Sequence, residues 1–146
     1  MQKLNLPSYQ FKLKNSENKQ LIFDIIRKKY VVLTPEEWVR QNFIHFLIYE
    51  KKYPISLIAI EKQLTINQLK KRFDALVFNT DGKPHILIEC KAPSIKISQN
   101  TFDQIARYNI KIKANFLIIT NGLTHYCCKF DSKNEQYIFL KNIVSF

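Results

Sequence analysis

Two carboxylates and a lysine stand on two neighbouring apolar segments of the sequence. Asp74 belongs to the first segment, and Glu89 and Lys91 belong to the second. The pair Asp81-Gly82 between the segments favours a type I′ hairpin turn. With that pair as a two-residue loop, Asp74 and Glu89 are expected directly opposite each other, with Cβ atoms about 4.5–5.5 Å apart. Lys91 then points to the same face, opposite Arg72.

Such an arrangement predicts a metal site. Two facing carboxylates repel each other, and a divalent cation between them removes the repulsion. Hard oxygen ligands favour Mg²⁺ or Mn²⁺ over zinc, and such an ion polarises a phosphate and acidifies a bound water. Lys91 could orient that water or neutralise charge that develops on the phosphate. The alternative is structural, with Asp74 and Lys91, or Glu89 and Arg72, forming diagonal salt bridges.

A third carboxylate comes from a predicted helix. Thr34 as N-cap, Pro35 at the first position and Glu37 at the third predict a helix from residue 34 to about residue 51. Glu37 is expected to complete a capping box with Thr34. Glu36 falls within the apolar stripe of this helix, so it is a candidate for the site, and stabilisation of the helix N-terminus is the equal alternative. The sequence leaves open which of the two glutamates faces the site.

A second predicted helix, residues 100–113, adds polar side chains. Gln104 and Tyr108 are one turn apart on one flank of this helix and could hydrogen-bond to a lysine or a phosphate. Arg107 and Lys111 face solvent beside them. Ordinary helix-surface residues are the alternative for this group.

The remaining elements predict a mixed sheet with helices on its faces. Expected strands cover residues 54–61, 72–79, 84–92, 115–120, 125–130 and 136–140, with turns at 65–68 and 121–122 and a loop at 93–99. The order is α-β-β-β-α-β-β-β, an α/β fold. Residues 1–20 are expected to form a polar, lysine-rich arm or edge segment, and residues 21–146 a single domain. Residues 21–33 carry no clear pattern.

Composition narrows the functional classes. The chain has 146 residues and a formal net charge of +11, which favours a polyanionic partner such as DNA, although a Lys-rich composition can also reflect coding bias. The two glycines, Gly82 and Gly122, are too few for a phosphate-binding loop or a dinucleotide-binding turn. Three cysteines without metal-ligand spacing, and no long apolar stretch, predict a soluble protein of the reducing cytoplasm without membrane contact.

Taken together, these motifs resemble the PD-(D/E)XK nuclease superfamily. More closely, they are similar to the N-terminal nuclease domain of type I restriction enzyme R subunits, over about residues 20–130. The matching segments are Thr34-Pro35-Glu36-Glu37-Trp38-Val39-Arg40-Gln41, Arg72-Phe73-Asp74, Ile88-Glu89-Cys90-Lys91-Ala92-Pro93, Gln104-Ile105-Ala106-Arg107-Tyr108 and Thr120-Asn121-Gly122.

The resemblance implies a restriction-endonuclease-like αβββαβ core and Mg²⁺- or Mn²⁺-dependent DNA endonuclease activity. It implies metal binding by Asp74, Glu89 and the Cys90 carbonyl, a Lys91 that assists the water, a Glu36 that supports metal or water, and Gln104 with Tyr108 steadying the site. Arg72, Arg107, Tyr108 and Lys111 are the expected DNA contacts.

Two departures from the family pattern matter. Phe73 replaces the proline of the superfamily name, and the chain has no helicase motor. We therefore expect it to cut alone, as a monomer or homodimer, or to need a restriction-system or helicase partner. A non-catalytic DNA-binding or scaffold subunit with the same fold is the alternative function.

Overall fold

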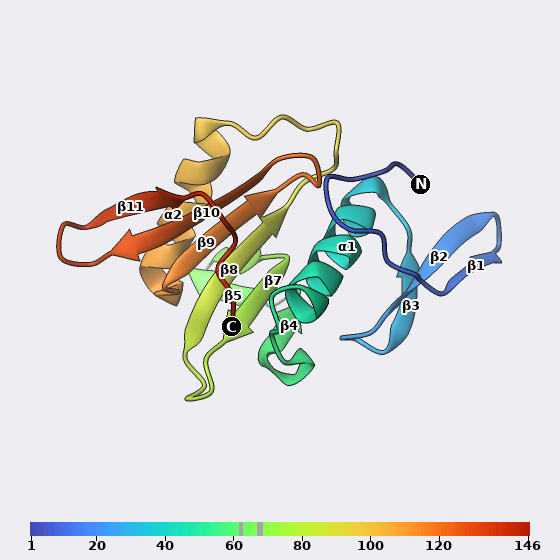
Figure 1. Ribbon diagram of the computed structural model, residues 1–146, viewed down its shortest axis with the longest axis horizontal. Helices are drawn as coiled ribbons and strands as arrows, with labels where there is room; N and C mark the ends of the chain where they lie inside the picture. The colour runs from blue at the N-terminus through green and yellow to red at the C-terminus, as the bar shows by residue number, and fades with distance from the viewer. Residues whose placement is uncertain (62, 67–68) are drawn as a thin grey trace.

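A six-stranded mixed sheet forms the centre of the molecule. The computed structural model describes the backbone of residues 1–61, 63–66 and 69–146, and the side chains of residues 1–61 and 72–146. The strand order is β11-β10-β9-β8-β7-β4, and only β8 and β9 run parallel (Figure 1). The strands are β4 (Ile58–Ile60), β7 (Ala75–Phe78), β8 (Pro84–Cys90), β9 (Phe116–Thr120), β10 (His125–Asp131) and β11 (Gln136–Leu140).

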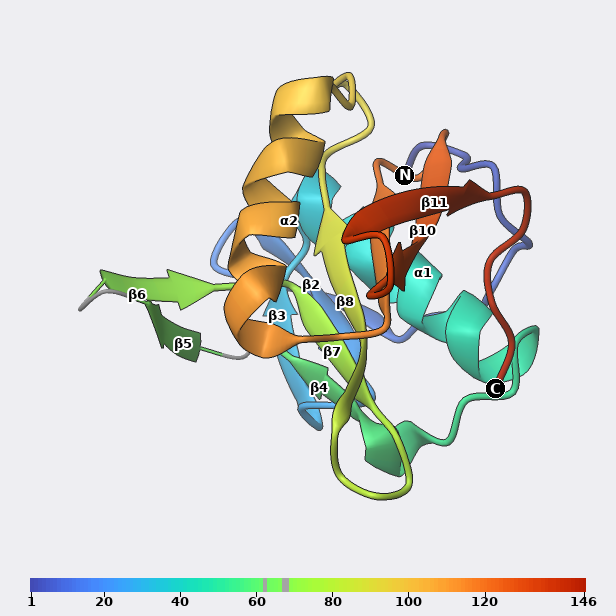
Figure 2. The ribbon, with the colours of Figure 1, turned by 90° about the vertical axis from the view of Figure 1, so that its left-hand side faces the viewer.

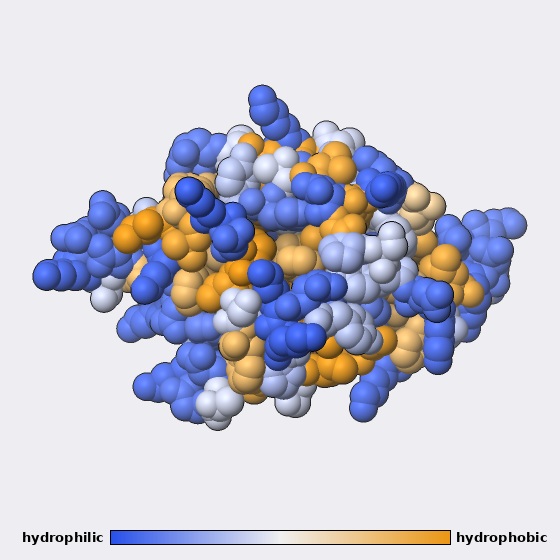
Figure 3. All heavy atoms as spheres, viewed as in Figure 1, coloured by the Kyte–Doolittle hydropathy of each residue, from blue (hydrophilic) through white to orange (hydrophobic). Residues whose placement is uncertain are grey.

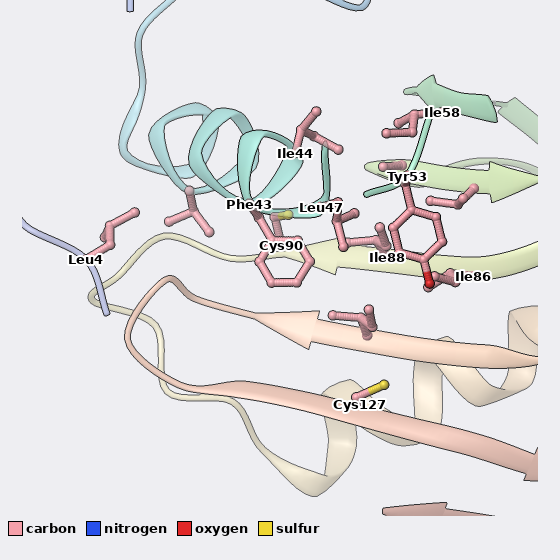
Figure 4. Close-up of a cluster of buried hydrophobic side chains, with 14 residues drawn as sticks. Leu4, Phe43, Ile44, Leu47, Tyr53, Ile58, Ile86, Ile88, Cys90 and Cys127 are labelled. Atoms are coloured by element: carbon pink, nitrogen blue, oxygen red, sulfur yellow. The ribbon is translucent and has the colours of Figure 1, made fainter. Parts of the chain in front are cut away.

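One helix covers each face of this sheet, as the sequence predicts. Alternate strand residues point to opposite faces, so the sheet contributes to two cores. α1 (Pro35–Tyr49) packs on one core through buried Val39, Phe43 and Leu47 (Figure 4). α2 (Gln99–Ile112) lies on the other face of the sheet (Figure 2). Its Ile105 and Ile112 are buried in the second core. The α/β class and the mixed sheet are thus confirmed.

A second, three-stranded antiparallel sheet precedes α1 in the chain. Its strands are β1 (Leu13–Ser16), β2 (Lys19–Asp24) and β3 (Lys29–Val32). α1 lies between this sheet and the six-stranded one (Figure 1). The N-terminal segment also contacts α1. The centre of the Phe11 ring lies 5.3 Å from the centre of the Trp38 ring and 4.5 Å from that of the His45 ring. α1 is therefore buried on more faces than a single apolar stripe predicts.

The hairpin between β7 and β8 has the predicted register but a different turn. Ala75 pairs with Ile88 and Val77 with Ile86, as a loop at residues 81–82 requires. The loop itself spans residues 80–82, because the Asn79 N–H donates to the Lys83 carbonyl at 2.8 Å. Of these loop residues only Gly82 has a positive φ, 85°, whereas a type I′ turn needs two. A bulge after Val77 restores the expected register, so the prediction of a type I′ turn is wrong.

Other boundaries also differ from the expected ones. Residues 55–57 form a short 3₁₀ turn (Ile55–Leu57) before β4, within the segment expected to be one strand. β5 (Gln63–Ile66) and β6 (Leu69–Arg72) form a separate antiparallel hairpin that projects from the body (Figure 2). The turn expected at residues 65–68 overlaps β5, and its second half lies outside the described residues. No helix in the described residues is long and apolar enough to cross a membrane.

Candidate functional site

The first turn of α1 brings one glutamate to the end of β8. The Thr34 hydroxyl accepts a hydrogen bond from the Glu37 N–H at 3.0 Å, which begins the helix as predicted. The Glu37 carboxylate does not return to the N-cap, because it binds Arg40 at 2.7 Å and Gln41 at 2.9 Å inside the protein. Glu36 is half exposed and lies within hydrogen-bonding reach of the Asp74 carboxyl. The glutamate at the site is thus Glu36.

Asp74 stands directly before β7 and turns its side chain toward α1. The ladder with β8 ends at the Ala75–Ile88 pair, one residue short of Asp74. Its Oδ1 accepts from Arg40 Nη2 at 2.5 Å, and its Oδ2 accepts from the Cys90 N–H at 2.7 Å. The carboxylate thereby receives a backbone N–H at the end of β8. The break between β6 and β7 places Phe73 in the core under α2, whereas Ala75, two residues later, lies in the core under α1.

Glu89 and Lys91 lie at the end of β8. The Lys91 Nζ is 3.6 Å from Glu89 Oε1, and both side chains are partly buried. The Lys91 ammonium also acts on Glu36 across the site. The Lys91 N–H donates to the Thr120 carbonyl at 2.8 Å, which fastens this end of β8 to β9. Glu36, Asp74, Glu89 and Lys91 are therefore brought together. The sequence predicts this meeting for Asp74, Glu89 and Lys91, and it leaves open whether Glu36 or Glu37 joins them. Arg72 does not stand opposite Lys91, because it ends β6, where it pairs with Gln63.

Two arginines connect the carboxylates of the site. Arg40 contacts Glu36, Glu37, Glu61 and Asp74 at 2.5–3.3 Å. Arg27, in the turn after β2, binds Glu37 at 3.1 Å and Glu61 at 3.0 Å, as well as Asp24. The Arg40 side chain is 7% exposed, and its Nε is a buried donor without a partner.

The network carries more negative than positive charge. Six carboxylates belong to it, against four described cations, which leaves two formal negative charges. These carboxylates are half of the twelve acidic residues of a chain with 23 basic ones. The site is therefore an acidic centre in a basic protein. The members are Asp24, Glu36, Glu37, Glu61, Asp74 and Glu89, with Arg27, Arg40, Arg72 and Lys91.

Burial and the close packing of the carboxylates shift the pKa values of Glu36, Arg40 and Cys90. Burial and the neighbouring Asp74 raise the pKa of Glu36, although Arg40 and Lys91 oppose the shift. Burial alone would lower the pKa of Arg40, but Asp74 and Glu37 raise it, so the guanidinium stays charged. Burial, followed by the charge of Asp74, raises the pKa of the Cys90 thiol well above its ordinary value. Cys90 is thus a neutral, buried thiol, and only its backbone is available to the site.

The oxygen ligands of the site decide whether it fits a divalent cation. In the described part of the chain, no group of three or more histidine, cysteine, aspartate or glutamate side chains is arranged to hold a metal ion. Mg²⁺, however, needs only one or two protein carboxylates and takes its remaining ligands from water and substrate. Asp74 and Glu89 supply hard oxygen donors, and the network leaves two negative charges to neutralise. The residues therefore fit such an ion.

The polar residues of α2 lie at different distances from the candidate site at the end of β8. α2 begins near the end of β8 and runs back along it (Figure 2), so Gln104 is nearer to the site than Lys111. The two are about 10 Å apart along the helix axis. Gln104 is exposed and Tyr108 is half-buried against the core under α2. Arg107 is exposed and lines a groove of about 890 Å³ between α2 and the β10–β11 hairpin.

Arg27 and Arg40 were not identified from the sequence as parts of the site. Asp24 and Glu61, the carboxylates that pair with them, were not identified either. Arg40 follows Glu36 by four residues and Glu37 by three, the helical spacing of an ion pair. That spacing could have identified Arg40. Asp24 and Arg27 lie in a segment without a clear pattern, and Glu61 reaches both arginines only through the tertiary fold.

The chain is similar to known proteins in both sequence and fold. Residues 35–143 match the model of the type I restriction enzyme R protein N terminus (HSDR_N). A solved fragment from Vibrio vulnificus YJ016, described as an HsdR subunit of a type I restriction enzyme, is similar in fold, with a TM-score of 0.57 and 20% sequence identity. The match covers 77% of this chain and 24% of that one, so the chain spans about a quarter of its length. No curated protein matches the sequence. The chain belongs to the family of type I restriction enzyme R protein N-terminal domains.

Proposed function

We propose that this protein is a divalent-metal-dependent DNA endonuclease that hydrolyses phosphodiester bonds. The observation that carries the proposal is the meeting of Glu36, Asp74, Glu89 and Lys91 at the end of β8, inside a network with surplus negative charge. The family of the chain and its net charge of +11 support DNA as the substrate. The free thiols of Cys90, Cys127 and Cys128 are compatible with work in a reducing cytoplasm.

In this proposal Asp74 and Glu89 hold Mg²⁺ or Mn²⁺, together with the Cys90 carbonyl. The bound ion would polarise the phosphate and acidify a water. Arg40 fixes the Asp74 carboxylate, whose second oxygen is held by the Cys90 N–H. The chain thereby presents Asp74 in one orientation before a ligand arrives, which reduces the reorganisation needed at the site.

Lys91 and Glu36 have complementary roles. The ammonium of Lys91 stabilises negative charge on the non-bridging phosphate oxygens as it increases in the transition state. Glu36 accepts a proton from the attacking water, a role that its raised pKa and half-exposed position suit. The new bond joins the water oxygen to phosphorus, and the bond to the leaving sugar oxygen breaks. Gln104 and Tyr108 steady this end of the site from α2.

A second function has its own supporting observation. Asp74 already carries a cationic partner in Arg40, so the site is partly neutral without a metal. A DNA-binding or scaffold subunit that keeps the fold but does not cleave DNA would need no metal at this site, because the Arg40–Asp74 ion pair already stabilises it. It would act with a restriction-system or helicase partner, and a partner that delivers DNA would also serve the catalytic function.

Nicking of supercoiled plasmid with Mg²⁺ or Mn²⁺ tests the first function. Lys91→Ala and Asp74→Asn are expected to abolish nicking while the protein remains folded. Lys96→Ala is the matched control for lysine loss, because Lys96 is exposed in the loop after β8. Isothermal titration with Mn²⁺ gives a second measurement, in which Asp74→Asn is expected to lose binding and Lys91→Ala to keep it.

The outcomes separate the two functions. Metal-dependent nicking that disappears in Lys91→Ala and persists in Lys96→Ala supports the nuclease. Equal nicking by the wild type and Lys91→Ala would reject it. Wild-type protein that binds DNA but neither binds Mn²⁺ nor nicks supports the non-catalytic subunit.

A further inference from the structure

The outer face of the β1–β3 sheet carries lysines and aromatic rings. The antiparallel register places Lys12 and Lys14 of the first strand region beside Phe23 of β2 and Tyr30 of β3. The opposite face turns inward, because Ile22 and Asp24 lie there and are buried. The outer face also includes Ser16, Lys19, Leu21 and Val32.

The lysine ammonium groups are held over the rings. The Lys14 Nζ lies 4.1 Å from the centre of the Tyr30 ring, and the Lys12 Nζ lies 5.5 Å from that of Phe23. Cation–π contacts of this kind keep a charge at a defined place on the surface. Lys12, Lys14 and Lys19 are all exposed. Residues 12–32, all of which the structure describes, include two acidic residues, and neither lies on the outer face. Asp24 points inward and Glu17 lies in the β1–β2 turn, so the outer face is basic.

The sheet is fastened to the candidate site. Arg27, in the turn between β2 and β3, binds Asp24 of the sheet and also Glu37 and Glu61 of the site network. The sheet therefore has a fixed position relative to the acidic centre. Figure 3 shows hydrophilic residues around a small apolar patch over the β1–β3 end of the molecule, in the view of Figure 1.

The charge of the site explains why such a surface is needed. Two surplus negative charges repel the phosphates of a nucleic acid, so attraction must come from cations around the centre. The family match begins at residue 35 and leaves the whole β1–β3 sheet outside it. We infer that the outer face of this sheet is a DNA-binding surface, in which Lys12, Lys14 and Lys19 contact backbone phosphates. The choice of DNA rests on the proposed function.

Binding of a short DNA duplex in EDTA tests this surface without requiring cleavage. Fluorescence anisotropy over a series of KCl concentrations gives the affinity and its salt dependence. The variant K12Q/K14Q/K19Q is expected to bind about tenfold or more weakly, and the slope of log K against log salt is expected to fall by about 2.7, or about 0.9 for each lost phosphate contact.

The matched control removes the same charge outside the β1–β3 sheet. K129Q/K133Q/K141Q changes two exposed lysines of the β10–β11 hairpin, which lies opposite the β1–β3 sheet (Figure 1), and exposed Lys141 directly after β11. The surface is supported if only the sheet variant loses affinity and salt slope. Equal losses in the two variants, or a loss in neither, would overturn it. Thermal unfolding of both variants verifies the fold.

Two further experiments identify the ligand of the β1–β3 surface and distinguish DNA binding by this surface from cleavage at the candidate site. A short RNA duplex and polyglutamate are titrated in parallel, and equal binding of either through the same lysines would overturn DNA as the ligand. Binding through the sheet by a protein that does not nick DNA rejects the nuclease and keeps this surface. Nicking with an unchanged KM in K12Q/K14Q/K19Q keeps the nuclease and rejects this surface.

Discussion

Arg40 and Asp74 form a buried ion pair between α1 and the start of β7. Arg40 Nη2 lies 2.5 Å from Asp74 Oδ1, and both side chains are less than one tenth exposed. The pair joins the helix that carries Glu36 to the strand hairpin that carries Glu89. It therefore holds together the two halves of the candidate site, and it neutralises Asp74 in the absence of a ligand.

Replacement of Arg40 is expected to destabilise the fold strongly. Arg40→Gln leaves Asp74 and Glu37 as buried charges without their main partner, which costs about 3–5 kcal/mol of unfolding free energy. Arg72→Gln is the matched control, because Arg72 is 58% exposed and contacts Glu61 at 3.6 Å, and about 0–1 kcal/mol is expected. Urea denaturation measures both. Similar losses for the two variants would contradict a central role of Arg40.

Glu36 is expected to lower stability as the pH rises. Its raised pKa means that the folded state favours the protonated carboxyl, so this contribution is present at low pH and is lost as the pH rises through 4.5 and then through the folded pKa. Glu36→Gln should therefore match the wild type in acid and become the more stable protein near neutral pH, while nicking falls. Thermal unfolding across this range is the measurement. Glu50→Gln, at the exposed end of α1, controls for loss of one carboxylate.

The sequence predicted the parts of this site that depend on local pattern. Glu89 and Lys91 lie two residues apart at the end of one strand, and Thr34-Pro35 determines where the helix of Glu36 begins. The hairpin register was also correct, although the turn was not, because the bulge after Val77 compensates for the longer loop.

The rest depends on tertiary contacts. No periodicity indicates that Asp74 leaves its strand to meet Arg40 and the Cys90 N–H. The β1–β3 sheet mixes lysines with apolar and aromatic residues on its outer face, and its strands are short, so its pattern is weak. Its link to the site runs through Arg27, whose partners lie 3, 10 and 34 residues away along the chain.

Asp24 is expected to stabilise the β1–β3 sheet above its pKa. Burial opposes the shift, but hydrogen bonds from Arg27 and Ile26 and the Arg27 charge keep the pKa of Asp24 below its ordinary value. This stability is present above pH 3.8 and is lost as the pH falls through the folded pKa. Asp24→Asn should cost about 1–3 kcal/mol at neutral pH and less in acid. Thermal unfolding compared with exposed Asp81→Asn measures this, and a pH-independent cost would contradict it.

The two glycines test how tightly the N-terminal segment packs. Both have a positive φ, but a Cβ at Gly82 meets nothing within 4 Å, whereas one at Gly122 would lie 2.7 Å from Leu4 Cδ2 and 3.2 Å from Val39 Cγ2. Gly82→Ala is expected to cost about 1 kcal/mol of backbone strain. Gly122→Ala adds overpacking of about 1–3 kcal/mol.

A double-mutant cycle with Leu4→Ala isolates this contact. With Leu4 shortened, the cost of Gly122→Ala should fall toward that of Gly82→Ala, because the nearest side-chain atoms are gone. Urea denaturation of the four proteins gives the coupling. Additive costs would mean that Leu4 does not pack on Gly122, and the N-terminal segment that leads to the β1–β3 sheet would then have a different path over α1.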